Sequence, residues 1–220
     1  MTSYVRLDAD EIGGGDAYRL MTSLVAPRPI AWVSTVSADG RHNLAPFSYF
    51  QAVCSRPPTI VLGLGSRPDG TPKDTLRNIL DTRELTISHV DRALVDAMNQ
   101  TSGDYGPGVD EWAIADGGRP LASAPSQRVA PPRVAAARAA LECRMTHAIP
   151  LGEAPHGGPS STLVVARVVG FVVAAELLQR DAAGKLGTID PAALDTVGRL
   201  GGIAYATTND TFELSRPKVS

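Results

Sequence analysis

The stretch IAWVSTVSADGRHNLAPFSYF, residues 30–50, decides the fold of this chain. Residues 30–37 are rich in β-branched side chains, which favour a strand. Asp39-Gly40 follows them, and an Asp-Gly pair between two such runs is a strong signal for a tight hairpin turn. The chain should therefore return as a second antiparallel strand from His42 into Phe50 and beyond. Pro46 cannot donate a hydrogen bond to a sheet, so it indicates that this return strand lies at an edge.

Further strands are predicted after this hairpin. They are Thr59–Leu64, Glu84–Val90, Leu141–Ile149 and Thr162–Ala175, the last with a bend at Gly170. Helices are predicted over Asp16–Leu24, Asp74–Leu80 and Arg92–Asn99, each aspartate acting as an N-cap, and a further capped segment begins at Asp190-Pro191. At least six strands without regular strand-helix-strand alternation favour a closed or partly closed antiparallel barrel over a doubly wound sheet. The chain is thus predicted to be mainly β, with peripheral helices.

The composition describes one ordinary soluble domain of 220 residues and 23.1 kDa, with a formal net charge of −2. The densest basic stretch, Arg128 to Arg138, holds three arginines, too few to predict a nucleic acid partner. The longest apolar run, Leu163 to Ala175, is interrupted by Arg167 and is shorter than the roughly 20 residues of a spanning helix. Neither a membrane segment nor a secretory signal is expected, so the chain is predicted to be cytoplasmic.

The side chains that commonly bind metals or act as nucleophiles are scattered. Cys54 and Cys143 have no CxxC or histidine companion, so neither a disulfide nor a metal site is predicted. Glu142 beside Cys143 should raise the thiol pKa, which argues against a cysteine nucleophile. The G-x-S-x-G and H-E-x-x-H motifs are absent. The four histidines are far apart in the sequence, at His42, His89, His147 and His156. No catalytic side chain is therefore identified.

Residues 101–132 form a long stretch rich in Gly, Pro, Ser and Ala, with one short helix predicted at residues 111–115. Connections of this length are uncommon inside a compact domain and mark either function or disorder. The segment is predicted to be an excursion from a single domain that spans residues 1–220.

The loop GLGSRPDGTPKDTLRN, residues 63–78, is a candidate phosphate site. Ser66, Arg67, Lys73 and Thr75 surround the expected start of a helix, where free N–H groups and a partial positive charge favour an anion. Asp74 would repel a phosphate unless it faces away and caps its own helix. A solvated surface loop is the alternative interpretation.

The hairpin is a second candidate site because hydroxyl groups occur on both faces of its first strand, at Ser34 and Thr35. After the turn, Asn43 and residues 45–48 offer small side chains and backbone amides without a titratable group. Such a surface suits a planar heterocycle that lies against backbone. A half-exposed edge with its hydroxyl groups in water is the alternative.

The motifs together resemble the flavin reductase-like proteins, most closely the flavoredoxin-type flavoproteins. The resemblance rests on PRPIAWVST at residues 27–35, NLAPFSYF at 43–50, KDTLRNI at 73–79 and RLGGIAY at 199–205, and it runs in order from about residue 19 to 217. It implies a six-stranded antiparallel split barrel of the Greek-key, FMN-binding type. It also implies a homodimer in which each FMN lies near the interface, and a nicotinamide, NADH or NADPH, that donates hydride to the flavin.

Position by position, the resemblance implies that Ser34 and Thr35 line the flavin, that residues 45–48 lie along its ring, and that Lys73 and Thr75, with Ser66 and Arg67, hold its phosphate. The full set of expected cofactor-binding residues is Arg28, Ser34, Thr35, Asn43, Ala45, Pro46, Phe47, Ser48, Ser66, Arg67, Lys73, Asp74, Thr75 and Asn78. With 2 Trp, 5 Tyr and 4 Phe in the chain, stacked aromatic rings are not expected to hold the flavin.

One departure from the family matters for function. The shorter flavin reductases carry a Gly-Asp-His motif where this chain reads GGPSSTL, residues 157–163, so no histidine that contacts nicotinamide can be assigned. The leading prediction is an oxidoreductase that binds FMN, rather than FAD, and passes hydride from NAD(P)H to an unidentified acceptor, with a monooxygenase or another redox partner. An FMN-holding electron carrier without a nicotinamide site is the alternative, and a flavin-free interaction barrel is a third.

Overall fold

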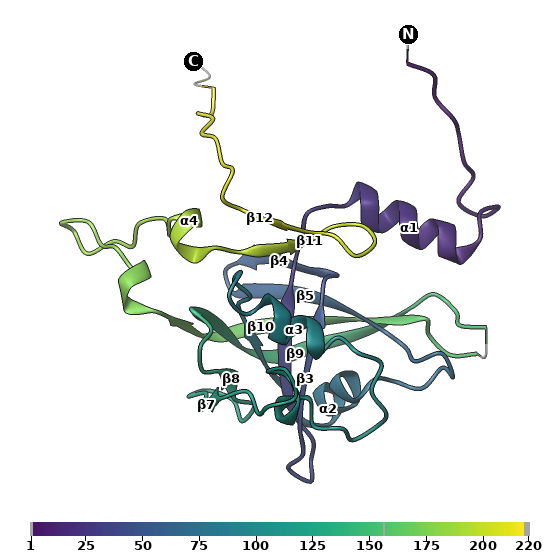
Figure 1. Ribbon diagram of the computed structural model, residues 1–220, viewed down its shortest axis with the longest axis horizontal. Helices are drawn as coiled ribbons and strands as arrows, with labels where there is room; N and C mark the ends of the chain where they lie inside the picture. The colour runs from purple at the N-terminus through teal and green to yellow at the C-terminus, as the bar shows by residue number, and fades with distance from the viewer. Residues whose placement is uncertain (1, 156, 218–220) are drawn as a thin grey trace.

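The computed structural model describes residues 2–155 and 157–217. In this part of the chain the main sheet has seven antiparallel strands, in the order β3-β2-β6-β9-β10-β5-β4 (Figure 1). Their bounds are β2 Ala31–Val36, β3 His42–Phe47, β4 Phe50–Ser55, β5 Pro58–Gly65, β6 Glu84–Ser88, β9 Ala139–Leu151 and β10 Ser161–Val173. The predicted barrel is confirmed, but it has one strand more than the six expected. The reason is that the return half of the hairpin divides into β3 and β4.

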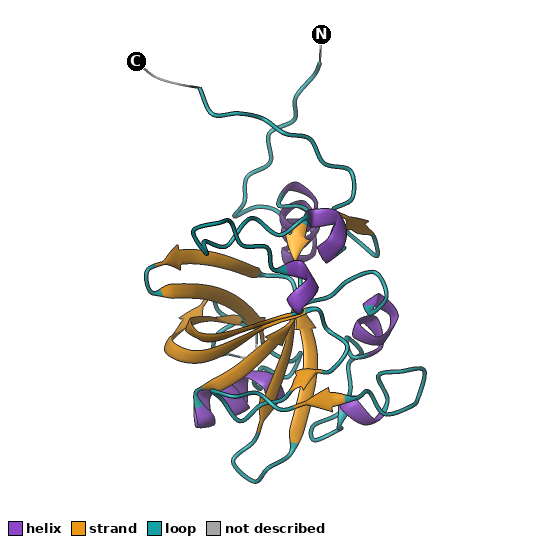
Figure 2. Cartoon of the chain, turned by 90° about the vertical axis from the view of Figure 1, so that its left-hand side faces the viewer, coloured by secondary structure: helices purple, strands orange, loops and turns teal. Residues whose placement is uncertain are grey.

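The division of this return segment curls the sheet into an open barrel. β3 and β4 are consecutive in the chain, yet they form the two opposite edges of the sheet. Between them Tyr49 accepts a hydrogen bond at 2.7 Å from the backbone N–H of Gly63 on β5. A Cβ atom at Gly63 would lie 3.0 Å from the Tyr49 Cβ, so glycine permits the close approach. The strands curve around the core as a result (Figure 2), and the edge position predicted for Pro46 is confirmed.

Two apolar clusters cover opposite faces of β2. Ala31 and Val33 face the barrel interior and pack with residues of β5, β6, β9, β10 and the helix α2 (Asp74–Thr82). Trp32 points to the other face, where it packs with Leu44 and with residues of α3 (Val95–Gln100) and the 3-10 turn η1 (Glu111–Ala113). Both faces of β2 are therefore buried, which explains why its sequence lacks the alternation of a half-exposed strand.

Of the predicted helix N-caps, the one at Asp190 is confirmed and the one at Asp16 is wrong. Asp190 accepts a hydrogen bond from the Ala192 N–H at 3.0 Å and Pro191 opens α4 (Pro191–Leu194), as predicted. The cap prediction for Asp16 is wrong because α1 (Gly14–Leu24) begins earlier, and Asp16 instead pairs with Arg19 from its first turn.

The excursion of residues 101–132 is ordered by contacts with the barrel. It contains η1 and the strand β7 (Ser123–Ala124), which pairs with β8 (Arg133–Val134). Its last part is held by Glu142 of β9, a buried carboxylate that accepts hydrogen bonds from the N–H groups of Gln127 and Arg128 at 2.9 and 2.7 Å. The predicted bend at Gly170 is confirmed as an irregularity in the β9–β10 pairing, and a Cβ atom there would lie 2.8 Å from the Glu142 Oε2.

A small sheet joins the two ends of the chain to one end of the barrel. Its strands are β1 (Arg28–Pro29), β11 (Val197–Arg199) and β12 (Tyr205–Thr207), with β11 in the centre. A short 3-10 turn, η2 (Ala175–Leu177), follows β10. α1 lies beside this sheet, and both chain ends leave the molecule on the same side (Figure 1). Among the residues described, no helix is long and apolar enough to cross a membrane.

Candidate functional site

A groove runs along β3 and the segment that follows it. It consists of two hollows of about 470 and 650 Å³ that share Pro46, Phe47 and Ser102. We call the hollow that also contains Arg67, Lys73 and Thr75 the polar end, and the hollow that also contains Tyr18, Arg199 and Tyr205 the aromatic end.

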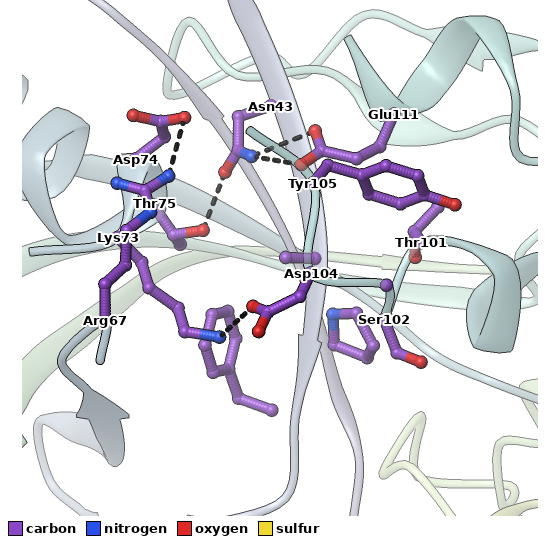
Figure 3. A pocket seen from close by; sticks show the side chains of 14 residues that line it. Asn43, Arg67, Lys73, Asp74, Thr75, Thr101, Ser102, Asp104, Tyr105 and Glu111 are labelled. Atoms are coloured by element: carbon purple, nitrogen blue, oxygen red, sulfur yellow. Dashed lines mark hydrogen bonds and ion pairs between the residues drawn. The ribbon is translucent and has the colours of Figure 1, made fainter. Parts of the chain in front are cut away.

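Two cations from the loop before α2 face the polar end (Figure 3). The Arg67 guanidinium donates to the Pro72 carbonyl at 2.8 Å and to the Asp74 carboxylate at 3.2 Å. The Lys73 Nζ lies 3.9 Å from Oδ1 of Asp104, a side chain of the excursion that is 81% exposed. Lys73 is also the N-cap residue of α2, so this cation and a helix N-terminus lie at the same place.

The prediction that Asp74 caps its own helix is wrong, since Lys73 is the N-cap residue, and the charge of Asp74 is compensated by other groups. Its carboxylate accepts hydrogen bonds from the Gly108 N–H at 3.0 Å, from Arg67 and, at 2.8 Å, from Arg77. Burial opposes its ionisation, but the Gly108 amide and the two guanidinium groups outweigh burial and keep the pKa of Asp74 below its usual value. Its charge is therefore compensated, and it does not exclude an anion from the polar end.

A buried polar network forms the wall behind the polar end. The Asn43 Oδ1 accepts hydrogen bonds from the hydroxyl groups of Thr75, at 2.7 Å, and Thr35, at 3.3 Å. The Asn43 Nδ2 donates to both carboxylate oxygens of Glu111, and Asn78 donates to Thr35 at 3.0 Å. Burial raises the pKa of Glu111, and this effect is larger than the lowering by its hydrogen bonds, which include one from the Leu44 N–H. The network fixes the side chains of Asn43 and Thr75 where they meet the groove.

The structure separates the expected site residues into two groups. Those it brings together along the groove are Asn43, Ala45, Pro46, Phe47, Ser48, Arg67, Lys73, Asp74 and Thr75. Those that do not line it are Arg28, Ser34, Thr35, Ser66 and Asn78. Ser34 and Thr35 are 0% exposed. The second apolar cluster covers Ser34 on the outer face of β2, whereas Thr35, on the inner face, is hydrogen-bonded to Asn43 and to Asn78 of α2.

Three of the residues outside the groove have structural partners instead. Arg28 donates from Nε to the Ser48 hydroxyl at 3.3 Å and from Nη2 to the Leu200 carbonyl at 3.0 Å. Ser66 donates to the Pro159 carbonyl at 2.7 Å, and Asn78 belongs to the buried network. Arg28 therefore acts as a brace that holds Ser48, at the aromatic end, against the turn after β11.

Sequence reasoning missed the groove residues that come from distant segments. The excursion contributes Thr101, Ser102, Asp104, Tyr105 and Glu111, and the C-terminal segment contributes Arg199 and Tyr205. The short helix predicted at residues 111–115 was the available signal for the excursion. The RLGGIAY motif was the available signal for the C-terminal segment. Three aromatic rings line the aromatic end, those of Tyr18, Phe47 and Tyr205, and of these only Phe47 was expected from the sequence.

The described residues give little support for a metal site or a cysteine nucleophile. No group of three or more His, Cys, Asp or Glu side chains is placed to hold a metal ion in this part of the chain. Burial, together with Glu142, raises the pKa of Cys143 to about 12, so this thiol stays protonated as the sequence suggested. His156 lies outside the described residues, and His147 is an exposed residue of β9.

A comparison with known families decides what kind of protein carries this barrel and groove. The family model described as the flavin reductase like domain matches residues 22–189. The chain belongs to the flavin reductase-like family. An uncharacterised protein of Halalkalibacterium halodurans is 38% identical to it, with 98% of each chain covered. At the level of the family, this flavin reductase-like protein is a flavin-binding oxidoreductase.

Solved structures support the same assignment. The crystal structure of nitrilotriacetate monooxygenase component B from Bacillus cereus matches with a TM-score of 0.87 and 32% identity, over 97% of this chain and 100% of that one. Flavoredoxin of Desulfovibrio vulgaris (Miyazaki F) matches with a TM-score of 0.66 and 22% identity, over 88% of this chain and 96% of that one, which shows the fold alone. The resemblance drawn from the sequence motifs is thereby confirmed.

The groove of this flavin reductase-like protein has the donor groups that an FMN molecule requires. Two cations, a threonine hydroxyl and a helix N-terminus at the polar end are donors suited to a phosphate. Of the carboxylates in the same lining, Asp74 is paired with two arginines, Glu111 with Asn43, and Asp104 with Lys73 across 3.9 Å. The segment of residues 45–48 and three aromatic rings extend from there and suit a planar ring system.

Proposed function

We propose that this protein binds FMN along the groove, with the phosphate at the polar end and the isoalloxazine ring at the aromatic end. The observation that carries the proposal is the division of one groove into a polar part, which contains Arg67 and Lys73, and an aromatic part, joined by Pro46 and Phe47. Arg67 and Lys73 would bind the phosphate, and the backbone of residues 45–48 would lie along the ring. Two cations at the polar end suit the single phosphate of FMN better than the diphosphate of FAD.

The chain's own residues would prepare the site in three ways. Arg67 is held by Pro72 and Asp74, so its guanidinium is positioned before the phosphate arrives. Lys73 would exchange its long contact with Asp104 for the phosphate. The buried network fixes the Thr75 hydroxyl at the groove wall. The bound flavin would supply the capacity to accept and release a hydride.

We further propose that NADH or NADPH reduces the bound flavin and that the electrons pass to a separate acceptor. The similarity to a protein named as one component of a monooxygenase supports a redox partner of that kind. A homodimer with the flavin near its interface also fits the exposed apolar side chains of α1. Met21 and Leu24 are 56% and 79% exposed, and Tyr18 of the same helix lines the aromatic end.

The first test is the visible spectrum of the purified protein, followed by titration with FMN. We expect retained flavin, or FMN fluorescence that is quenched with a micromolar dissociation constant. A colourless protein that neither retains nor quenches FMN would contradict the proposed site.

The alternative function is an FMN-holding electron carrier that takes electrons from a protein partner. The observation in its favour is the lack of histidine in residues 157–163, where the shorter flavin reductases carry a Gly-Asp-His motif. Anaerobic mixing with NADH and with NADPH distinguishes the two functions. A reductase loses its flavin absorbance near 450 nm within its turnover time, in the range of about 1 s for typical enzymes. A carrier keeps this absorbance until dithionite is added.

A further inference from the structure

The aromatic end of the groove contains a cation that the proposed FMN site does not yet use. Of the described residues that line this hollow, Arg199 is the only charged one. Its neighbours there include the rings of Tyr18, Phe47 and Tyr205 and the side chain of Met98. Arg199 is half-buried, so its charge is screened less than the charge of an arginine that is fully surrounded by water.

Arg199 is held in place by contacts on two sides. Its guanidinium carbon lies 4.5 Å from the centre of the Tyr205 ring, and Nη2 donates to the Gly202 carbonyl. The Tyr205 hydroxyl donates to the Asn99 side chain at 3.1 Å, which fixes the ring. These contacts position the guanidinium without neutralising it.

The backbone that carries Arg199 is also fixed. β11 pairs with β1 on one side and β12 on the other, and Arg199 is opposite both Arg28 and Tyr205. The Arg28 brace ties the following residue, Leu200, to Ser48. Arg199 and the segment expected to lie along the flavin ring are thus parts of one rigid arrangement.

Arg199 also has no carboxylate to neutralise it among the described residues. The ion pairs there within 4.0 Å involve Arg19, Arg41, Arg67, Lys73, Arg77 and Arg144. A guanidinium that is positioned but not paired can bind an anion that forms beside it.

We propose that Arg199 stabilises the reduced form of the bound FMN through the negative charge that reduction creates. Two electrons and one proton added to the neutral oxidised ring leave it with one negative charge. A fixed cation at the ring end lowers the free energy of this anion and hardly affects the neutral oxidised ring. Arg199 therefore raises the reduction potential of the flavin. The inference rests on the proposed FMN site.

The test compares how tightly the wild type and one variant bind FMN in its oxidised and reduced forms. Dissociation constants for oxidised FMN and for dithionite-reduced FMN are determined anaerobically for the wild type and for Arg199→Gln. We expect less than a threefold change for the oxidised form and at least a tenfold weaker affinity for the reduced form. A tenfold change in this ratio corresponds to a midpoint potential lower by about 30 mV for two electrons.

A matched control is available in Arg180→Gln. Arg180 is an exposed arginine that donates to a glycine carbonyl, Gly184, much as Arg199 donates to Gly202. It is not among the residues that line either end of the groove. Its variant should leave both affinities and the potential unchanged. Arg199→Lys, which keeps the charge, should retain most of the difference between the two redox states.

Each result decides between the inference and its alternatives. Equal weakening of both redox states, or an unchanged ratio, overturns the inference and makes Arg199 a general binding residue. An unchanged ratio with a raised KM for an anionic acceptor assigns Arg199 to that acceptor instead. If Arg199→Gln does not fold, Arg199→Met, which keeps an unbranched side chain of similar length without the charge, replaces it. A wild type that binds FMN in neither state defeats the proposed function itself.

Discussion

Asn43 and Glu111, 68 positions apart in the chain, are joined by one amide nitrogen that lies 3.0 and 2.9 Å from the two carboxylate oxygens. The same carboxylate accepts a hydrogen bond from the Leu44 N–H at 3.1 Å. These contacts attach the excursion of residues 101–132 to the edge strand β3. The wall of the groove therefore depends on Glu111, a residue that lies far from the hairpin in the sequence.

Replacement of Glu111 should destabilise the protein. Glu111→Ala leaves the Asn43 amide and the Leu44 N–H buried without an acceptor, which costs about 1–3 kcal/mol. The free energy of unfolding in urea measures the effect. Glu213→Ala, in the exposed C-terminal segment, is the control and should change it by less than about 0.5 kcal/mol. A loss no larger than that of the control would show that the contact with β3 does not order the excursion.

Removal of Lys73 should weaken FMN without unfolding the protein. The side chain of Lys73 is 40% exposed, so the core does not depend on it. We expect Lys73→Ala to raise the dissociation constant of FMN about tenfold, or roughly 1.4 kcal/mol, with riboflavin affinity unchanged because riboflavin has no phosphate. Lys185→Ala, at an exposed loop, is the matched control. An unchanged FMN affinity in Lys73→Ala would place the phosphate elsewhere.

Removal of the Asp104 carboxylate should strengthen the binding of FMN. Asp104 pairs with Lys73 at 3.9 Å, so Asp104→Asn should release the lysine and strengthen FMN binding. An exposed pair contributes at most about 1 kcal/mol, which limits the gain to about fivefold. Titration of FMN measures the change, with Asp210→Asn as the control.

The same pair can be tested by a double-mutant cycle. In a Lys73→Ala background the benefit of Asp104→Asn should disappear, because Asp104 then has no partner cation to release. A benefit that persists without Lys73 would mean that Asp104 repels the phosphate directly rather than competing for the lysine.

His89 should make stability fall in acid. Burial lowers the pKa of His89 below its usual 6.5, only partly opposed by the charge of Asp91, while Arg138 adds to the lowering. The folded state therefore binds a proton less readily than the unfolded state, and the contribution of His89 to stability decreases as the pH falls through 6.5. Urea unfolding between pH 8 and pH 5 measures this dependence.

Two variants isolate the contribution of His89. His89→Gln should be less sensitive to acid than the wild type over this range, since the variant has no imidazole to protonate. His147→Gln, at an exposed position of β9, should keep the wild-type dependence. Identical pH profiles for wild type and His89→Gln would contradict the prediction.

Local sequence signals predicted several elements of this fold. The Asp39-Gly40 turn, the edge position of Pro46 and the cap at Asp190 depend on neighbouring residues, and all three are confirmed. The loop with Arg67 and Lys73 was found for the same reason, because a helix start and its nearby cations are close in sequence. Whether this loop binds phosphate stays a prediction.

Long-range packing decided what the sequence could not. The hydroxyl group of Ser34 is buried because α3 and η1 cover the outer face of β2, and that of Thr35 is buried because α2 packs on the inner face. Nothing near these residues in the sequence indicates either cover. The return strand divides into β3 and β4 at Tyr49, whose carbonyl accepts a hydrogen bond from Gly63 of β5, a residue distant from the hairpin turn.

By itself, the sequence determined the barrel hairpin, the cationic loop and the family, since each is written in residues that lie close together or in ordered motifs. Only the tertiary structure decided which of those residues meet the groove. It placed Arg28 as a brace behind Ser48, brought Asp104 and Glu111 from the excursion to one end, and brought Arg199 from the C-terminal segment to the other. The physical reason is that burial and charge neutralisation depend on neighbours in space, and segments far apart in the chain supply those neighbours.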